Sequence, residues 1–556
     1  MKSKLYEIIT DSFKRAYEKG FFPSARLVEI EIEEPRKAEH GDFSTNAAMK
    51  SASLYKMPPK KIAEILLDSI KDTEGIIEKA EIAGSGFINF FISKKFWYPI
   101  LKQIHKKGAL YGSADIGKGK KVLIEFVSAN PTGPLHIGHG RGAAVGDVFA
   151  KIFSFCGYKV SKEYYLNDAG RQINTLGRSV FLRYKEIFDK KIDFPQDCYK
   201  GGYIKDIANK IKELKKDQLL KAEEKDTIKF CAKFAADVIL KGIKQDLSEF
   251  GVEFDNWFSE RSLYKFGKID AAIEDFKEKK YIYEKEGALW FNSSLFGDEK
   301  DRVVVRQNKE ATYFASDIAY HKDKFERGFD KVIDVWGADH HGYIPRLKAA
   351  IQTLGYKKEN FEVILIQFVN LLRDGIPIAM STRAGEFVTL KEVIKEVGKD
   401  AARFIFLTRH HESPLDFDLE LAKKRSSDNP LYYVQYVCAR ISSIISKKQE
   451  DKKGSFGSEY DISALMLLKE PEEISIIKNL SLFQETVILA AAFAEPHRIV
   501  YYLIELASLF HNYYNKHKIL TDDVLLEKAR IYLAQAIKTV IKSGLNLLGV
   551  EALERM

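Results

Sequence analysis

The sequence predicts an α/β protein with a Rossmann-like parallel sheet at its centre, an α+β domain before it and an all-α bundle after it. The apolar run 122–127 reads as a buried strand, followed by a loop with two prolines, a helix over 138–155 and another strand-like run at 159–166. This order is typical of a βαβ crossover with a nucleotide-binding turn. From residue 416 onward, amphipathic helical patterns dominate, which predicts a helical bundle.

A chain of 556 residues exceeds what one hydrophobic core supports, so we expect several domains. We place an N-terminal α+β domain at 1–112, a catalytic Rossmann domain at 113–415 and an α-helical domain at 416–556. The first boundary falls in the Gly- and Lys-rich segment 111–121, which reads as a linker.

In the first domain, the first twenty residues form an amphipathic helical pattern with Leu5, Phe13 and Tyr17 among the residues on its apolar face. A second helical stretch covers 60–69, and a strand-like run covers 87–92. Mixed elements of this kind predict a small α+β domain.

In the central domain, a charged helical stretch at about 177–280 reads as an insertion carried on the sheet. Strand-like runs return at 303–306, 331–335 and 361–368, so we expect the parallel sheet to resume there. The final domain is expected to contain four main helices, at 432–446, 475–494, 499–517 and 524–548.

Composition excludes several protein classes. The longest apolar run, 487–494, is far shorter than the roughly 20 residues that cross a bilayer, so no membrane span is expected. Acidic residues in the first helix argue against a transit peptide. The four cysteines are far apart, with no metal-ligand spacing, and indicate reduced thiols in a cytoplasmic protein. The net charge of +9 fits either a solvated surface or an RNA partner.

The turn after the first buried strand contains His136, Gly138 and His139 at the start of a helix. Two imidazoles and the free N–H groups of a helix N-terminus can bind a phosphate, and Gly138 lets a flat base approach the backbone. A structural pair of loop histidines is the alternative, but the preceding strand and following helix favour a phosphate site, for which ATP is one candidate.

The run 128–141, with its His-Ile-Gly-His core, resembles the first signature of class I aminoacyl-tRNA synthetases, in the version found in bacterial arginyl-tRNA synthetases. Further segments resemble that family in the expected order, at 40–46, 165–172, 313–317, 336–343, 380–385, 413–418 and 548–550. The resemblance covers nearly the whole chain. It implies ATP-dependent activation of L-arginine to arginyl-adenylate, followed by transfer to the 3′ end of tRNA(Arg).

The chemistry of arginine recognition tests this resemblance. A guanidinium is planar, permanently charged and rich in donors, so a selective pocket needs at least one carboxylate. The resemblance places Glu125 and Asp317 at this pocket, Ser128 and Asn130 at the α-amino and carboxylate end, and Tyr313 along its wall. Asp317 could alternatively be a helix cap or a surface acid.

For ATP, the resemblance implies contacts from His136, Gly138 and His139, and from Asp339 and His340. The resemblance implies Mg²⁺ with the nucleotide. We expect no protein-bound zinc, because adjacent histidines lack the usual tetrahedral spacing.

The second signature of the class is normally Lys-Met-Ser-Lys, and here it reads Ala379-Met380-Ser381-Thr382. Met380 and Ser381 are still expected at the ATP site, with Ser381 and Arg383 assisting catalysis. Because both lysines are replaced, Arg383, Arg141 or Lys121 could supply the missing charge, or the enzyme could be slow.

For tRNA, the resemblance implies base reading by Phe43 and Asn46, although a buried aromatic is the simpler interpretation of Phe43. Tyr432, Tyr436 and Arg440 open the helical domain, where the resemblance places anticodon binding.

The sequence therefore predicts a cytoplasmic, monomeric arginine–tRNA ligase that uses ATP, L-arginine and tRNA(Arg). Two alternatives stay open, namely another nucleotidyltransferase with the same histidine turn, and a tRNA-binding homologue weakened or inactivated at residue 379.

Overall fold

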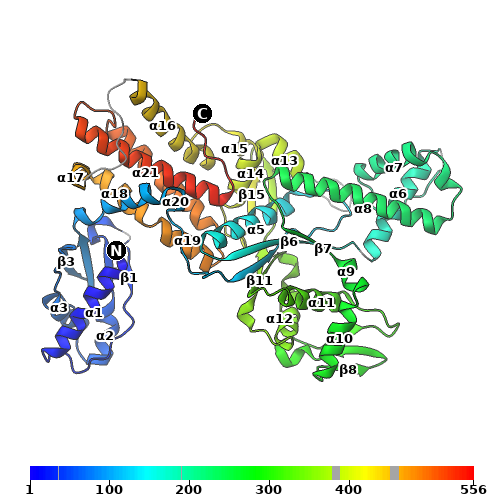
Figure 1. The fold of residues 1–556 in the computed structure, drawn as a ribbon, viewed down its shortest axis with the longest axis horizontal. Coiled ribbons are helices and arrows are strands. Elements are labelled where there is room, and N and C mark those ends of the chain that lie inside the picture. Colours follow the sequence, from blue (N-terminus) through cyan, green and yellow to red (C-terminus); the bar gives the residue numbers. More distant parts are fainter. Residues whose placement is uncertain (36, 169, 189–190, 379–387, 451–461) are drawn as a thin grey trace. The chain divides into compact units, whose positions relative to one another are not determined.

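The computed structural model describes residues 1–35, 37–168, 170–188, 191–378, 388–450 and 462–556 (Figure 1). The chain divides into two compact units. Unit 1 comprises Met1–Lys106, Gly454–Lys478 and Leu520–Leu533, and unit 2 comprises Lys107–Lys453, Asn479–Ile519 and Ala534–Met556. The mixed fold, with its parallel sheet, N-terminal α+β domain and helical C-terminal domain, confirms the predicted fold class.

Unit 1 contains an antiparallel sheet with strand order β1-β2-β4-β3. Its elements are α1 (Lys2–Glu18), β1 (Ile32–Glu33), β2 (Phe43–Thr45), α2 (Ala47–Tyr55), α3 (Pro59–Ser69), β3 (Ile77–Ala83), β4 (Phe87–Ile92) and α4 (Pro99–Lys107). The helix α1 buries Leu5, Ile9 and Phe13, as its periodicity predicts. Tyr17, predicted on the same face, is exposed because it lies at the edge of the buried stripe, whereas its neighbour Ala16 lies within that stripe and is buried.

Unit 2 is built around a parallel sheet of five strands in the order β12-β11-β5-β6-β7. These strands are β5 (Lys121–Glu125), β6 (Lys159–Leu166), β7 (Asn256–Ser259), β11 (Lys331–Gly337) and β12 (Phe361–Ile366). The chain order reverses between β5 and β11, and ligands of such sheets bind outside the carboxyl ends of the strands at this switch point. The topology therefore places the candidate site at the ends of β5 and β11.

The prediction that run 303–306 resumes the parallel sheet is wrong. Strand β10 (Arg302–Val305) instead joins a separate antiparallel sheet with β9 (Ala288–Phe291) and β8 (Ile282–Lys285). The turn between β8 and β9 consists of Glu286 and Gly287, both with positive φ, as a two-residue type I′ hairpin turn requires. A short apolar run does not reveal which sheet it joins, and this local hairpin recruits β10.

Helices connect and cover these strands in unit 2 (Figure 1). They are α5 (Ile137–Phe155), α6 (Arg171–Glu186), α7 (Gly202–Lys215), α8 (Glu224–Glu249), α9 (Glu260–Lys265), α10 (Lys268–Glu278), α11 (Tyr313–Glu326), α12 (Ile344–Thr353), α13 (Leu390–Val397) and α14 (Lys399–Phe406). The stretch 177–280 is mostly helical, but β7 interrupts it and adds the edge strand of the parallel sheet. A third small sheet contains β13 (Val369–Arg373), β14 (Ile376–Pro377) and β15 (Leu415–Asp418).

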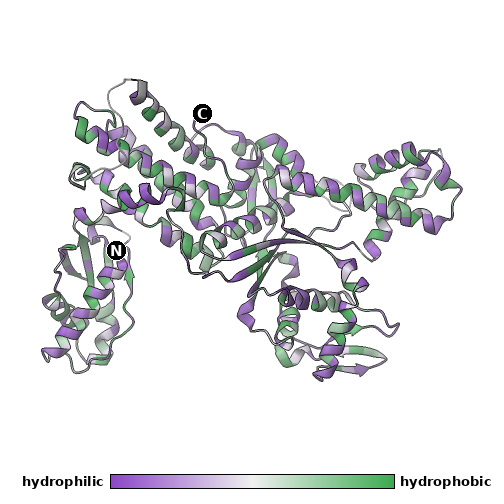
Figure 2. Cartoon of the chain, in the orientation of Figure 1, coloured by the Kyte–Doolittle hydropathy of each residue, from purple (hydrophilic) through white to green (hydrophobic). Residues whose placement is uncertain are grey.

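The C-terminal part is helical, and hydrophobic and hydrophilic residues alternate along its helices in Figure 2. Its helices are α15 (Leu419–Lys423), α16 (Pro430–Glu450), α17 (Ile462–Leu465), α18 (Pro471–Ser481), α19 (Phe483–Ala492), α20 (His497–Lys516) and α21 (Val524–Leu548). The helix expected at 475–494 is thus two helices, with Leu482 between them.

One apolar helical stretch bears on the expectation of no membrane span. Among the residues that the structure describes, Pro471–Ala492 is long and apolar enough by composition to cross a bilayer. Half of this stretch is buried inside the fold, and the core helices of globular proteins meet the same criterion.

The helix α5 runs from the switch point back along the sheet and is buried on most of its surface. Its glycines allow this close contact, since a Cβ at Gly146 would lie 2.3 Å from Cγ of Phe126. On the same helix, Asp147 binds the fully buried Arg403 of α14, with Nη2 2.6 Å from Oδ2. Arg403 also donates to the carbonyls of Phe250 and Leu548, so one guanidinium joins α5, α8 and α21.

We expect Arg403→Met to destabilise the protein by about 3 kcal/mol or more, because it leaves a buried carboxylate short of its main partner and two carbonyls without donors. Thermal unfolding followed by circular dichroism measures the change. The control is Arg425→Met, which alters an exposed arginine. Equal melting temperatures for the two variants would contradict a structural role for Arg403.

Candidate active site

The carboxyl end of β5 has a strained backbone. Ser128 N donates to Phe126 O at 2.9 Å, and the residue between them, Val127, has φ of +66°. This is a γ-turn of the rarer, strained kind, and a β-branched residue tolerates it poorly. Ser128 itself has φ of +40°. Strain at a strand end is typical of functional sites, and here it turns Ser128 back toward Glu125.

The two signature histidines begin α5. His136 caps the helix, with Nδ1 accepting from Gly138 N at 3.1 Å, while His139 Nδ1 accepts from His136 N at 3.2 Å. Burial lowers the pKa of both rings, that of His139 to about 3. Both imidazoles are therefore neutral at pH 7. Because Nδ1 accepts in each ring, the proton is on Nε2, which makes Nε2 a hydrogen-bond donor.

A buried charge network lies beneath this strand end. The Lys324 ammonium, on α11, contacts Glu125 Oε2 at 2.5 Å and Asp334 Oδ1 at 2.8 Å. His321 Nε2 lies 2.8 Å from Asp334 Oδ2. All four side chains are buried. Burial raises the pKa of Glu125, whereas at Asp334 the charges of Lys324 and His321 outweigh burial and lower the pKa.

Ser128 connects the network to the candidate site. Its Oγ donates to Glu125 Oε1 at 2.8 Å and accepts from Tyr165 N at 3.1 Å. Asn130 Nδ2 donates to Gln172 Oε1 at 2.8 Å. Since Glu125 already binds Lys324 and Ser128, the structure leaves it less available to a guanidinium than the sequence suggested.

Asp317 differs from Glu125 in its surroundings. It is half-buried and accepts from the Tyr343 hydroxyl, and it forms no ion pair with any residue that the structure describes. Burial raises the pKa of Asp317 to about 6, and the nearby charges of Glu125 and Asp334 act in the same direction. Tyr313, one helical turn earlier on α11, is 54% exposed. The charge of Glu125 acts on Asp317 and helps to raise its pKa.

Glu260, the first residue of α9, is a further acid that was not predicted from the sequence. It is only 2% exposed, and the hydroxyls of Ser316 and Tyr165 hydrogen-bond its carboxyl group. Burial, with the charges of Asp317 and Asp168, raises its pKa to about 7. A second acid therefore lies behind Asp317. The one sequence feature that could have indicated Glu260 is its position directly after a strand of the parallel sheet. Because β7 was not predicted, this position was not recognised.

A cavity of about 900 Å³ opens beside Tyr313. Three arginines line it, namely Arg171, Arg261 and Arg306, together with Tyr264. The cavity combines permanent positive charge with aromatic rings. Phosphates and stacked bases bind to such surfaces.

Asp339 and His340 follow β11, the strand next to β5, so their backbone lies at the same edge of the sheet as the histidine turn. Both side chains are exposed, and His340 Nε2 lies 3.5 Å from Asp339 Oδ2. The residues predicted to bind nucleotide thus lie on both sides of the switch point.

Two of the basic residues proposed to replace the missing lysine are excluded. Arg141 is fully buried and donates to the carbonyls of Gln367, His410 and Ser413, so it is structural. Lys121 begins β5 and lies at the opposite end of the strand from the histidine turn. Ala379, Met380, Ser381, Thr382 and Arg383 lie outside the described residues.

The two residues of unit 1 that were predicted to contact tRNA do not offer an exposed surface on which a base could stack. Phe43 is 3% exposed and stacks on Trp97, with ring centroids 6.1 Å apart. Asn46 donates to Glu31 Oε2 at 3.0 Å. The geometry favours the simpler interpretation of Phe43 as a core residue of the sheet.

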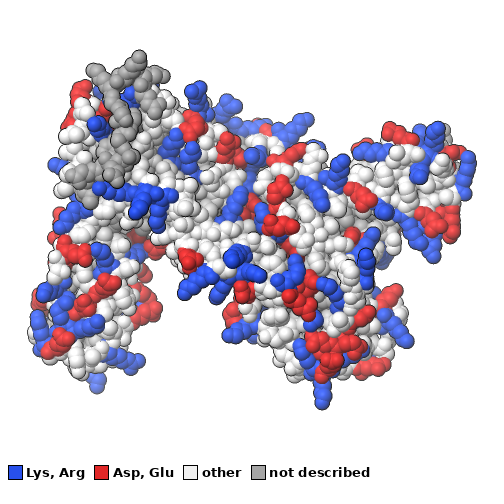
Figure 3. All heavy atoms as spheres, in the orientation of Figure 1, with Lys and Arg blue, Asp and Glu red and all other residues white. Residues whose placement is uncertain are grey.

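In unit 2, Tyr432, Tyr436 and Arg440 form a half-exposed stack on α16. The two rings lie 5.8 Å apart, and the Arg440 guanidinium lies over Tyr436 and Tyr514. On the face shown in Figure 3, basic and acidic side chains are interspersed. Charge alone therefore does not mark one RNA-binding face in this view.

We expect Lys324→Met to destabilise the protein by about 3 kcal/mol or more, because Glu125 and Asp334 would then lie close together without their shared cation. Their folded-state pKa values would rise above the unfolded ones, so the unfolded state would bind fewer protons and stability would fall as pH rises. The decrease in melting temperature relative to the parent protein should be larger at pH 8 than at pH 5.5. The control is Lys322→Met, on the same helix but at the surface, and a pH-independent loss would contradict the network.

Comparison with known proteins agrees with this geometry. The family model described as "tRNA synthetases class I (R), catalytic domain" matches residues 100–413. The models "Arginyl tRNA synthetase N terminal domain" and "DALR anticodon binding domain" match residues 4–92 and 434–556.

Full-length relatives extend this agreement. Arginine–tRNA ligases of Desulfosudis oleivorans and Citrifermentans bemidjiense are 57% and 52% identical over the whole of both chains. The Thermus thermophilus arginyl-tRNA synthetase structure superposes with a TM-score of 0.76 at 22% identity over both full chains, which shows the same fold. Because the catalytic model and full-length relatives agree, the chain belongs to the arginyl-tRNA synthetases, the class I arginine–tRNA ligases.

Proposed function

We propose that the site at the carboxyl end of β5 binds L-arginine, with Asp317 as the carboxylate that receives the guanidinium. The observation that carries this proposal is a carboxylate without an ion-pair partner among the described residues, at the strand ends where ligands of such sheets bind. A buried acid with a raised pKa is costly in the free protein, and a guanidinium removes that cost. Tyr313, one turn away, forms the wall along the aliphatic stem.

Glu125 acts indirectly in this proposal. Its contacts to Lys324 and Ser128 fix the strand end, so that Ser128 and Asn130 can bind the α-amino and carboxylate end of the amino acid. Its negative charge also adds to the field at Asp317. Specificity for arginine over lysine then follows from paired hydrogen bonds in a fixed fork, which a single ammonium cannot make.

ATP binds across the switch point. The neutral His136 and His139 donate from Nε2 to phosphate oxygens, Gly138 leaves space for the adenine, and Asp339 and His340 contact the ribose side. The altered second signature completes the ATP site with Met380, Ser381 and Arg383, because the signature of this class contacts ATP. Mg²⁺ enters with ATP, since phosphate oxygens are the ligands that this ion prefers.

The reaction has two steps. An oxygen of the arginine carboxylate attacks the α-phosphorus, and the bond to the bridging oxygen breaks to release pyrophosphate. The terminal 2′-OH of tRNA then attacks the arginyl carbonyl, and AMP leaves. This chain's residues act by holding the groups in line and by stabilising charge on the phosphates.

Two features support a proposal for the tRNA contacts. The half-exposed stack of Tyr432, Tyr436 and Arg440 offers aromatic rings and a guanidinium to anticodon bases. The arginine-lined cavity beside Tyr313 suits the phosphates of the acceptor end. The enzyme acts as a monomer in the cytoplasm, where its four buried thiols stay reduced.

The test of this function is ATP–pyrophosphate exchange with each amino acid, with and without tRNA(Arg). We expect exchange with arginine alone among the amino acids, and only when tRNA is present. Exchange with another amino acid would contradict the pocket assignment. No exchange at all, with tRNA binding intact, would support the alternative of a homologue inactivated at Ala379.

We expect Asp317→Asn to raise the KM for arginine by about 10²-fold or more, because the amide provides no charge for the guanidinium. The KM for ATP should change little. Steady-state aminoacylation measures both constants, with Glu326→Gln at the surface end of the same helix as the control. An unchanged KM for arginine would contradict the assignment of Asp317 to the arginine pocket.

Glu260→Gln should change how arginine binding depends on pH. The guanidinium favours ionised acids, and Asp317 and Glu260 have raised pKa values of about 6 and 7, so both must lose protons as arginine binds. In the parent enzyme, the KM for arginine should therefore rise as pH falls from 8 to 6. In Glu260→Gln this rise in the KM for arginine should be smaller. The surface variant Glu278→Gln should show the same pH dependence of the KM as the parent enzyme.

The same substitution should stabilise the free enzyme at pH 8. A raised folded-state pKa means that stability is lost as pH rises from the unfolded value of about 4.3 toward the folded one, and the amide abolishes this loss. A lower melting temperature for Glu260→Gln at pH 8 would show that Glu260 is a structural acid only.

A further inference from the structure

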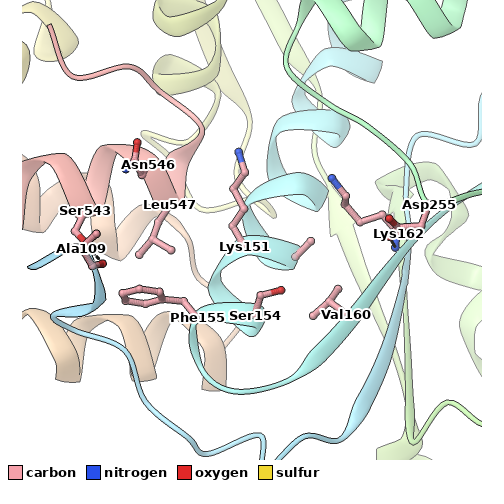
Figure 4. A pocket seen from close by; sticks show the side chains of 11 residues that line it. Ala109, Lys151, Ser154, Phe155, Val160, Lys162, Asp255, Ser543, Asn546 and Leu547 are labelled. Carbon is pink, nitrogen blue, oxygen red and sulfur yellow. Dashed lines mark hydrogen bonds between the residues drawn. The ribbon is translucent and has the colours of Figure 1, made fainter. Parts of the chain in front are cut away.

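A second cavity, of about 590 Å³, lies in unit 2 at the far end of α5 (Figure 4). It is formed by the end of α5, the start of β6, the last turns of α21 and the segment before β5. The helix α5 has 19 residues and is therefore about 28 Å long. Because the signature histidines begin this helix, the cavity is remote from the nucleotide site.

The polar side of this cavity carries a surplus of positive charge. Lys151 Nζ lies 3.0 Å from Asp147 Oδ2, and Lys162 Nζ lies 3.1 Å from Oδ1. Arg403 contacts the same carboxylate at 2.6 Å. Three cations thus share a single buried acid.

The acids nearest to this cluster do not cancel the surplus. Asp255, which also lines the cavity, accepts from the backbone N–H of Lys162 at 2.7 Å and removes one charge at most. The charge of Arg403 acts on Asp400, whose pKa is raised by burial. Among the described residues, Asp147 is the one carboxylate in direct ion-pair contact with Lys151, Lys162 and Arg403.

The two lysines are the cations that a ligand can reach. Arg403 is fully buried, whereas the side chains of Lys151 and Lys162 are 35% and 21% exposed. Figure 4 shows both amino groups extending from the cavity wall on the same side. Burial lowers the pKa of Lys151, and the charges of Arg403 and Lys162 act in the same direction against that of Asp147, so an added anion would favour the charged ammonium.

The opposite side of the cavity is apolar. The ring of Phe155 and the side chains of Val160 and Leu547 form it (Figure 4), and Ser154 and Asn546 are exposed residues of the cavity lining. An ammonium pair beside an apolar surface suits a molecule with an anionic group and a flat apolar group. A phosphate monoester has close to two negative charges at neutral pH and accepts several hydrogen bonds at once.

We propose that this cavity is a second ligand site, which binds a small phosphate monoester with an aromatic or similarly flat group. Lys151 and Lys162 hold the phosphate, and the flat group rests on Phe155, Val160 and Leu547. The site is independent of the arginine, ATP and tRNA contacts assigned above, and its test does not require that assignment to be correct.

The experiment is isothermal titration calorimetry of the full chain with phenyl phosphate, in the presence of saturating arginine and a non-hydrolysable ATP analogue. We expect saturable binding that weakens as salt is raised. Inorganic phosphate should bind more weakly, because it lacks the group that covers the apolar side. Failure to bind phenyl phosphate at about 10 mM, a concentration that detects even feeble sites, would overturn the proposal.

The variant Lys151→Gln/Lys162→Gln should weaken binding by about 10-fold or more, as expected for the loss of two charge-assisted contacts. The matched control is Lys159→Gln, which removes an exposed lysine from the same strand as Lys162. Equal affinities in the double variant and the control would overturn the assignment of the phosphate contacts.

Since both lysines also support Asp147, the double variant could lose stability. Ser154→Phe avoids this problem because Ser154 is an exposed residue of the cavity lining and outside the ion pairs. It should block the cavity and abolish phenyl phosphate binding while the melting temperature and the exchange activity stay at parent values. Retained binding in Ser154→Phe would place the ligand elsewhere and overturn the proposal.

Discussion

The Lys324 ammonium between Glu125 and Asp334 is the interaction on which the catalytic unit depends. These acids lie opposite each other on the adjacent strands β5 and β11, exactly where the order of the sheet reverses. Two carboxylates at such a short separation repel strongly in a buried setting, and one shared cation makes the arrangement stable. Because the cation comes from α11, the helix that carries Tyr313 and Asp317 is fixed to the strand ends in the same contact.

Charge compensation divides the acids of the site into two groups. Glu125 and Asp334 share the Lys324 ammonium inside the protein, while Asp317 and Glu260 are held by the hydroxyl groups of Tyr343, Ser316 and Tyr165. A hydroxyl donor orients a carboxylate without cancelling its charge, so the second pair keeps its attraction for an incoming cation. Such acids with raised pKa values are costly to keep ionised in the free protein, and a bound cation would lower that cost.

The helix α5 connects this chemistry to the rest of unit 2. At its start, two histidines cap each other's backbone N–H groups and are kept neutral by burial. Along its length, Gly146 allows close contact with the sheet, and Asp147 is held by Arg403. Its end forms one wall of the cationic cavity. A single helix therefore carries the signature histidines at one end and Lys151 toward the other.

The sequence by itself determined the fold class, the βαβ unit around β5, α5 and β6, and the family, because periodicity and local motifs are properties of neighbouring residues. Tertiary structure alone decided which strands pair and which charges meet. Strand β10 joins a local hairpin, Arg141 binds carbonyls from segments more than 220 residues away, and Glu260 reaches Asp317 only because β7 adds to the sheet. Such contacts depend on burial and on distances between remote segments, and a linear pattern does not encode these quantities locally.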